Sequence, residues 1–215
     1  MTGVGTSGLG TIATPGLSTP GTSLANYSGK RVRIASFNVH ALGPTKLAKP
    51  HVSETLIRIL RQYDVVALQS IQSSRDDILP ILTERLNQSG RRYDYLIGPR
   101  VGNQESREQF AFVFDTNRIE TDRFQLYTIE DPENLVIYDP LVAWFRCKEP
   151  PPERAFTFSI VNVHLVATEL NDERQLLPSI IQAVELCQRS LTLIMKKIGQ
   201  SMAGIFKKDI LVTDC

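Results

Sequence analysis

The chain has little cysteine and no long apolar run. Its three cysteines are odd in number and lack CxxC spacing, which argues against a disulfide framework and against a zinc site. No run approaches the length of a membrane helix. No basic segment followed by an apolar run opens the chain, so no secretory signal is visible. We therefore expect a soluble protein without a membrane-spanning segment. The sequence does not indicate its cellular compartment.

An excess of charge of either sign is also missing. The 24 basic and 23 acidic residues leave a net charge of +1. This balance neither requires nor excludes a polyanionic partner, because local patches matter more than the sum. The 215 residues, 42% hydrophobic and 22% charged, are enough for one domain with a substantial core. Nothing in the sequence identifies a protein partner.

The first part of the chain has too few apolar residues to build a core. Residues 1–29 are mostly Gly, Ser, Thr and Pro, and such a composition cannot bury enough surface to offset its ordering entropy. We expect a disordered linker over 1–29 and a folded domain over 30–215. A linker at the start of a chain suggests that another segment preceded it.

The folded part mixes two periodicities. Alternating or β-branched apolar residues predict strands, and apolar residues three or four apart predict helices. Because strand-to-strand connections dominate the middle, the pattern indicates an α+β fold, in which 118–129 continues the antiparallel run of 108–115. We expect strands at 31–38, 64–70, 93–97, 108–115, 118–129, 140–147, 156–168 and 209–213, helices at 53–63, 76–87 and 171–197, and a loop at 41–50.

One predicted strand, Phe156–Thr168, carries a polar pair. Alternate residues of a strand share a face, so Asn162 and His164 lie on the face opposite Val161 and Val163. Such a pair is either a set of satisfied core groups or the floor of a site. The strand by itself leaves both interpretations open.

Several segments together resemble one family. The first predicted strand ends in Phe-Asn and the second in Leu-Gln-Ser, and the strand Phe156–Thr168 contains Asn-Val-His. In this order they resemble the endonuclease/exonuclease/phosphatase family, and deoxyribonuclease I in particular, over about Arg31–Val184. The resemblance implies a two-sheet sandwich flanked by helices. The segments that carry it are Arg33–Asn38, Tyr63–Ser70, Gly102–Phe114, Asp139-Pro140 and Ser159–His164.

The resemblance implies a metal-dependent phosphodiester hydrolase, of the DNA endonuclease type, with DNA as substrate and Mg²⁺ (or else Ca²⁺ or Mn²⁺) as cofactor. Such a reaction needs a hard cation, a positioned water and a proton carrier. By resemblance, Asn38 places its amide oxygen at the metal and phosphate, and His164 is the general acid or base. Glu108 holds the other ring nitrogen of His164, and Asp214 activates water. Taken singly, Asn38 is more often a turn residue at a strand end, and Glu108 more often a solvated charge before a strand.

The sequence departs from the family at its metal site and its DNA contacts. Ser70 stands at the position of the metal-binding Glu, and a hydroxyl is a weaker ligand for Mg²⁺ than a carboxylate. Two Arg and one Tyr that contact DNA in deoxyribonuclease I are replaced by Gln72, Tyr138 and Ser106.

The family's closing Ser-Asp-His is absent, and Asp209–Cys215 resembles only the approach to its Gly-Asp-x-Asn motif. Alternatively, the chain past Val184 is an unrelated tail, as a frame change would produce. We expect a fold incomplete at its C-terminal end and a poorly stable, aggregation-prone chain. The alternative function is a truncated or degenerate, inactive homologue that acts, if at all, as a binding module. A third interpretation keeps the fold and changes the substrate to a phosphorylated lipid head group or an inositol phosphate.

Overall fold

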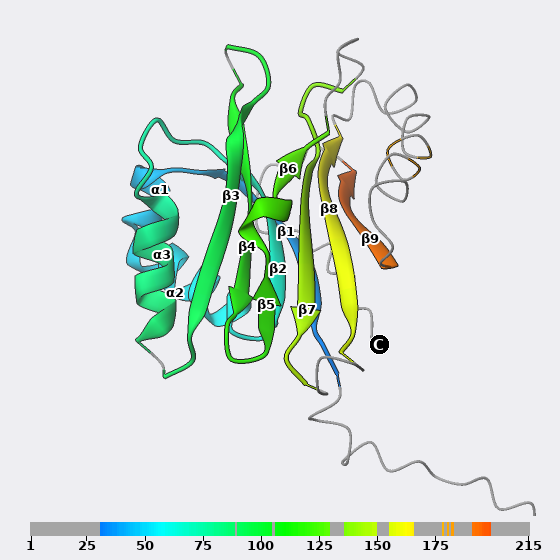
Figure 1. The fold of residues 1–215 in the computed structure, drawn as a ribbon. Coiled ribbons are helices and arrows are strands. Elements are labelled where there is room, and N and C mark those ends of the chain that lie inside the picture. The colour runs from blue at the N-terminus through cyan, green and yellow to red at the C-terminus, as the bar shows by residue number, and fades with distance from the viewer. Residues whose placement is uncertain are drawn as a thin grey trace, which may run out of the picture. The chain divides into compact units, whose positions relative to one another are not determined.

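Two β-sheets pack face to face, and helices α1 to α3 cover the outer face of one of them (Figure 1). This arrangement confirms the predicted two-sheet α+β sandwich. The computed structural model describes residues 31–88, 90–104, 106–129, 136–149 and 155–165, positions 178, 180 and 182, and the backbone of 191–198. The predicted linker 1–29, the predicted strand 209–213 and Asp214 lie outside the described residues.

The first sheet carries the first half of the domain. Its first two strands are parallel, and its other neighbouring pairs are antiparallel. A parallel pair needs a crossover connection, which helices α1 (Pro44–Leu47) and α2 (Pro50–Leu60) supply. Helix α3 (Ile78–Asn87) leads into the opposite edge of the sheet. In spatial order the strands are β1 (Ile34–Leu42), β2 (Val65–Ile71), β4 (Glu108–Asp115) and β3 (Tyr93–Val101).

The second sheet carries the polar pair identified in the sequence. Its order is β5-β7-β8-β9, with β6 pairing β7. Strand β8 runs antiparallel to β7 and parallel to β9. A short 3₁₀ helix, η2, lies between β5 and β6. The elements are β5 (Ile119–Thr121), η2 (Arg123–Gln125), β6 (Tyr127–Thr128), β7 (Leu141–Cys147), β8 (Thr157–Leu165) and β9 (Leu191–Ile198).

Apolar layers fill both sides of the first sheet. Between the sheets, the ring of Phe112 meets that of Phe145 edge-on, with centroids 5.5 Å apart, a favoured aromatic geometry. On the other side, Leu82 and Leu86 of α3 are fully buried. Because both faces are covered, β2 is buried along its whole length, and its sequence therefore reads as a nearly continuous apolar run. No helix in the described part of the chain is both long and apolar enough to cross a membrane.

The prediction of one strand over 118–129 was wrong. Asp122 ends β5, and its side chain accepts a hydrogen bond from the backbone N–H of Phe124 at the start of η2. The segment also does not continue the antiparallel run of β4, because both edges of β4 are occupied by β2 and β3. It pairs instead with β7 in the second sheet.

The chain between β1 and α2 was predicted as a loop, but it is largely helical. Strand β1 runs to Leu42, α1 follows at once, and α2 begins at Pro50 rather than at Ser53. Each helix has a proline in its first turn, where the missing N–H costs nothing and the fixed φ suits a helix. Pro44 and Pro50, which lie within the predicted loop 41–50, are helix starts in the structure.

The prediction of a single helix over 171–197 was also wrong at its end. Positions 178, 180 and 182 are helical, but Leu191–Ile198 is strand β9, paired along its length with β8. Short apolar runs satisfy helical and strand periodicities equally well. Pairing with the exposed edge of β8 decides the outcome, and this pairing cannot be read from the local sequence.

Asn162 joins the two sheets through a buried polar network. Its Oδ1 accepts a hydrogen bond from Nε2 of Gln69 at 2.5 Å, and its Nδ2 donates to the carbonyl oxygens of Leu68 at 3.0 Å and Ala111 at 3.3 Å. Asn162 and Gln69 are fully buried. The first interpretation of the polar pair, satisfied core groups, therefore applies to Asn162.

Replacing Asn162 by leucine is expected to lower the free energy of unfolding by about 2 kcal/mol or more, because it leaves buried polar groups on β2 and β4 without their hydrogen-bond partner. Urea denaturation measures this change. Ser159→Ala is the matched control, because Ser159 is equally buried on β8 but its hydroxyl has no hydrogen-bond partner in the described part of the chain. That variant is expected to be neutral within about 0.5 kcal/mol. Equal losses in the two variants would contradict the network.

Candidate active site

Four polar side chains from both sheets meet beside this network. Asn38 lies on β1, Ser70 on β2, Glu108 on β4 and His164 on β8. The Nδ2 of Asn38 donates to Oγ of Ser70 at 3.2 Å, and that hydroxyl donates to Oε2 of Glu108 at 2.9 Å. The second carboxylate oxygen, Oε1, lies 2.7 Å from Nδ1 of His164. The result is a continuous hydrogen-bonded chain across the gap between the sheets.

A β-bulge brings Ser70 into this chain. In a regular strand Ser70 would face the helices, since its neighbour Gln69 faces the second sheet. Ser70 instead has φ +62°, and the pairing of β2 with β4 shifts register between Leu68 and Ile71. Two successive side chains therefore face the second sheet, as bulges allow. A non-glycine residue at positive φ is uncommon and often marks a functional position.

His164 is held in one orientation by Glu108. The carboxylate is buried, with 1% of its side chain exposed, against 17% for His164. Because an ionised carboxylate only accepts hydrogen bonds, it places the proton of a neutral imidazole on Nδ1. The lone pair of Nε2 is then directed away from Glu108, and the amide of Asn38 lies 3.5 Å from it. Such a nitrogen can take a proton from water or from a hydroxyl.

Tyr138 is a further part of the site, one that the sequence comparison treated only as a lost arginine. Its ring stacks on the imidazole of His164, with centroids 5.1 Å apart and planes within 4°. Gly102, at φ +97°, makes room for it, since a Cβ there would lie 2.6 Å from Cε1 of Tyr138. Its place directly before Asp139-Pro140 was the available signal. The stack restricts rotation of the imidazole.

The donor atoms fit a tightly held divalent cation poorly. The Oδ1 of Asn38 accepts the backbone N–H of His40 at 2.8 Å, so the amide turns its nitrogen, not its oxygen, toward Ser70. Glu108 is already bonded through both oxygens. Among the described residues no group of three or more His, Cys, Asp or Glu side chains could hold a metal ion. Mg²⁺ prefers carboxylates and a near-octahedral set of oxygens, and Ser70 supplies no charge, while its hydroxyl is already bonded to Asn38 and Glu108.

The structure therefore brings together Asn38, Ser70, Glu108 and His164, as the resemblance implied, while their chemical roles stay predictions. Asp214 lies outside the described residues. Gln72 and Ser106, which stand at two DNA-contact positions of the family, are not part of the hydrogen-bonded chain.

Comparison with known proteins supports the fold and the sequence resemblance. No family model matches the chain. It is 31% identical over 146 residues to deoxyribonuclease gamma of Rattus norvegicus, which covers 66% of this chain and 46% of that protein. It is 24% identical over 177 residues to deoxyribonuclease-1-like 1 of Mus musculus, which covers 82% of this chain and 54% of that protein. The chain spans about half the length of the curated relatives it matches.

Solved structures give the same fold. The human Nocturnin catalytic domain with bound sulfate anion matches with a TM-score of 0.56 at 18% identity, covering 80% of this chain and 65% of that one. An endonuclease/exonuclease/phosphatase family protein from Bacteroides thetaiotaomicron matches with a TM-score of 0.52 at 15% identity, covering 77% and 62%. The fold of this chain is therefore that of endonuclease/exonuclease/phosphatase proteins, as the resemblance in the sequence implied. The sequence relatives named above are deoxyribonucleases.

Proposed function

We propose that this domain hydrolyses phosphodiester bonds in DNA, in the manner of a deoxyribonuclease I-type endonuclease, with a requirement for Mg²⁺. The observation that carries the proposal is the 2.7 Å contact between Nδ1 of His164 and Oε1 of Glu108. It supports a proton-transfer role for Nε2, which a phosphodiester hydrolase needs at the attacking or leaving oxygen. The amide nitrogen of Asn38 lies 3.5 Å from Nε2 of His164 and is a hydrogen-bond donor that would orient a phosphate oxygen there.

The cation requirement is proposed from the family, because the described side chains of this site offer only one carboxylate, Glu108. A divalent cation, when bound, neutralises charge on the phosphate oxygens. The polar side chains of this chain orient a proton carrier and a hydrogen-bond donor, but Ser70 stands where a carboxylate would be needed. We therefore expect slow nicking of supercoiled plasmid that needs millimolar Mg²⁺ and stops with EDTA. Nicking that continues in EDTA would contradict the metal requirement.

A second candidate function is that of an inactive homologue that binds a partner. The bonding of Ser70 to both Asn38 and Glu108 favours it, because the hydroxyl closes the position that a metal ligand would occupy. Such a chain would bind without cleaving. The two functions differ in what a carboxylate at position 70 would do.

Ser70→Glu is expected to raise Mg²⁺-dependent nicking by at least about tenfold, equivalent to about 1.4 kcal/mol of transition-state stabilisation. The added carboxylate lies beside Glu108, so its repulsion without metal and its relief by metal should make the melting temperature rise with Mg²⁺. Ser70→Gln is the control, with the same length and no charge. If Ser70→Glu and Ser70→Gln nick equally slowly and melt alike with Mg²⁺, the inactive homologue is the better description.

A further inference from the structure

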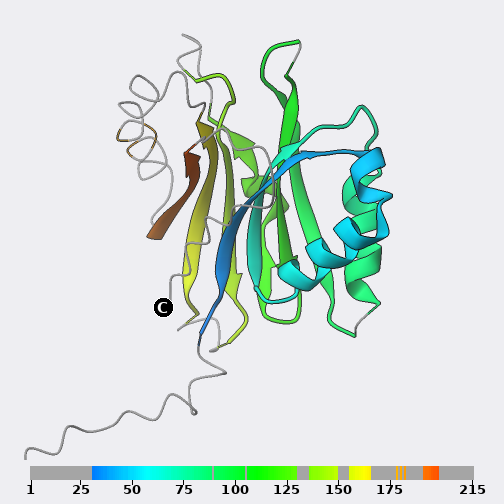
Figure 2. The same cartoon turned by 180° about the vertical axis from the view of Figure 1, so that it is seen from behind.

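The last part of β1 crosses from the sheet toward helix α1 (Figure 2), and its backbone is strained. His40 has φ +47° and Ala41 has φ +58°. Two successive non-glycine residues in the left-handed region are costly, because Cβ comes too close to the backbone. Both residues lie where the pairing of β1 with β2 shifts register, and neither has a partner in that pairing. Contacts outside this ladder are therefore needed to hold the segment.

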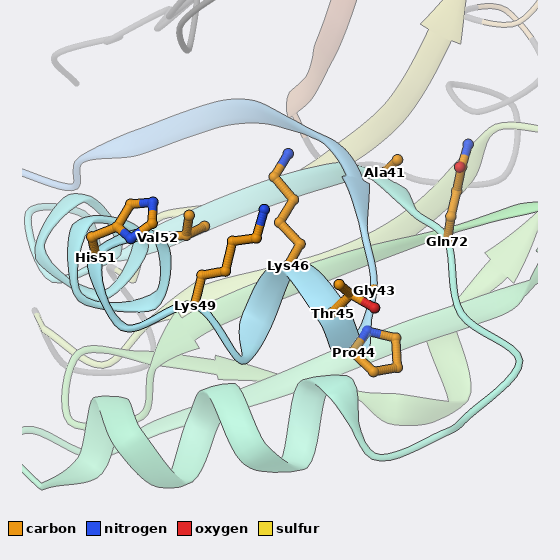
Figure 3. Close-up of a pocket in the computed structure, with 9 residues that line it drawn as sticks. All are labelled: Ala41, Gly43, Pro44, Thr45, Lys46, Lys49, His51, Val52 and Gln72. Carbon is orange, nitrogen blue, oxygen red and sulfur yellow. The ribbon is translucent and has the colours of Figure 1, made fainter.

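The side chain of Lys46, on α1, supplies such contacts. Its Nζ donates to the carbonyl oxygens of Val39 at 3.0 Å and His40 at 2.7 Å, and Figure 3 shows this side chain extending toward the ribbon of β1. Burial, and next the positive charge of Lys49, lower the pKa of Lys46 from its usual value. Burial takes water from the ammonium group, and the two carbonyl oxygens replace that water. Because these oxygens belong to the peptide groups before and after His40, Lys46 fixes the backbone on both sides of that residue.

The turn held in this way directs the amide of Asn38. The N–H of His40 is in the same peptide group as the carbonyl of Val39, and it donates to Oδ1 of Asn38 at 2.8 Å. With Oδ1 bonded on that side, Nδ2 donates to Oγ of Ser70 at 3.2 Å and lies 3.5 Å from Nε2 of His164. A continuous set of hydrogen bonds thus connects helix α1 with the candidate active site.

We propose that Lys46 is a positioning residue for the candidate active site: it fixes the peptide groups around His40 and thereby keeps the nitrogen of the Asn38 amide directed toward Ser70 and His164. The consequence for catalysis rests on the proposed function, in which this nitrogen orients a phosphate oxygen. The orientation itself can be measured in a chain that has no activity.

Hydrogen exchange followed by nitrogen-15 NMR of the whole chain tests the orientation. Lys46→Met removes the donor and keeps an unbranched side chain of similar length. We expect exchange of the backbone amide of His40 to become at least about tenfold faster, and the side-chain amide signals of Asn38 to shift, because Oδ1 loses its fixed donor. Exchange of the Ala35 amide, in the regular ladder of the same strand, should change by no more than about twofold. An equal rise at Ala35 would show general loosening of β1 and would overturn the positioning role.

Two further variants make the test specific. Lys49→Met is the matched control, because it removes the same charge from an exposed lysine whose side chain points the same way in Figure 3. Adding Ala41→Gly to Lys46→Met should restore part of the protection of His40, because glycine adopts a positive φ without strain. The proposal is overturned if Lys46→Met leaves the exchange of His40 and the Asn38 signals unchanged, or if Lys49→Met alters them as much.

Plasmid nicking adds a double-mutant cycle. Lys46→Met is expected to lower the rate by at least about tenfold in the natural chain and to have no further effect in Asn38→Ala, because it acts through that amide. Equal losses in the two backgrounds would contradict the positioning role. If the natural chain does not nick, the proposed function fails, and exchange at His40 still decides the role of Lys46.

Discussion

Replacing His164 by alanine is expected to lower the rate of plasmid nicking by at least about a hundredfold, the lower end of what a positioned acid or base contributes. The expectation follows from the site geometry: Glu108 holds one ring nitrogen, Tyr138 covers the ring, and the other nitrogen faces Asn38. A supercoiled-plasmid assay with Mg²⁺ measures the rate. Where the natural chain nicks too slowly to follow, Ser70→Glu serves as the background.

The control for His164→Ala is Ser159→Ala, which removes a buried hydroxyl from the same strand, one that has no hydrogen-bond partner among the described residues. Its nicking rate should stay within about twofold of the parent. Imidazole added to His164→Ala should restore part of the rate, because the alanine leaves a space beside Glu108 and Tyr138. Undiminished nicking by His164→Ala would remove the histidine from the mechanism and place the chemistry elsewhere.

Replacing Arg118 by methionine is expected to lower the free energy of unfolding by about 3 kcal/mol or more, since it leaves a buried charge unpaired. The side chain of Asp64 is fully buried, and its Oδ2 lies 2.6 Å from Nη1 of Arg118. The same oxygen accepts the backbone N–H of Arg33 at 2.7 Å. One backbone N–H cannot compensate for a carboxylate that has lost its guanidinium.

Denaturant unfolding compares Arg118→Met with Arg123→Met, which breaks the exposed pair between Arg123 and Asp94. That control should cost no more than about 1 kcal/mol, as surface ion pairs do. Adding Asp64→Asn to Arg118→Met should recover part of the loss, because no charge then stays buried. Similar losses from the two arginine variants would show that Asp64 finds water or another partner when Arg118 is gone.

Local sequence was sufficient where both faces of a strand are buried. Strands β2, β4 and β7 lie within a residue of the positions that their apolar runs predicted, and burial explains the runs. It was insufficient where tertiary pairing chooses between states. Leu191–Ile198 fits a helix by spacing and becomes a strand because β8 offers an edge. Asp122 ends a strand because its side chain accepts a hydrogen bond from the backbone N–H of Phe124. Such local hydrogen bonds compete with the backbone pairing of a strand.

The candidate site could be predicted only through resemblance. Glu108 and His164 are 56 residues apart in the chain, and nothing in their local patterns joins them. The stack of Tyr138 on His164 was missed, since position 138 was judged only by the arginine that it replaces. The closure of position 70 by hydrogen bonds depends on the positive φ of Ser70, a backbone choice that its neighbours in the sequence do not specify.

Register breaks lie side by side across the first sheet, and they divide its mechanical behaviour in two. Away from the breaks the ladders are continuous, so we expect hydrogen bonds there to open only when the whole domain unfolds. At the breaks the hydrogen-bond ladder is interrupted, so we expect the end of the sheet at the site to open locally while the hydrogen bonds at the other end stay closed. The continuous part of the sheet is thus expected to be rigid, and the strand segments at the breaks to be more mobile. The residues that would touch a substrate lie in these segments. The breaks fall at Asn38/Leu42 in β1, Leu68/Ile71 in β2 and Ile97/Arg100 in β3.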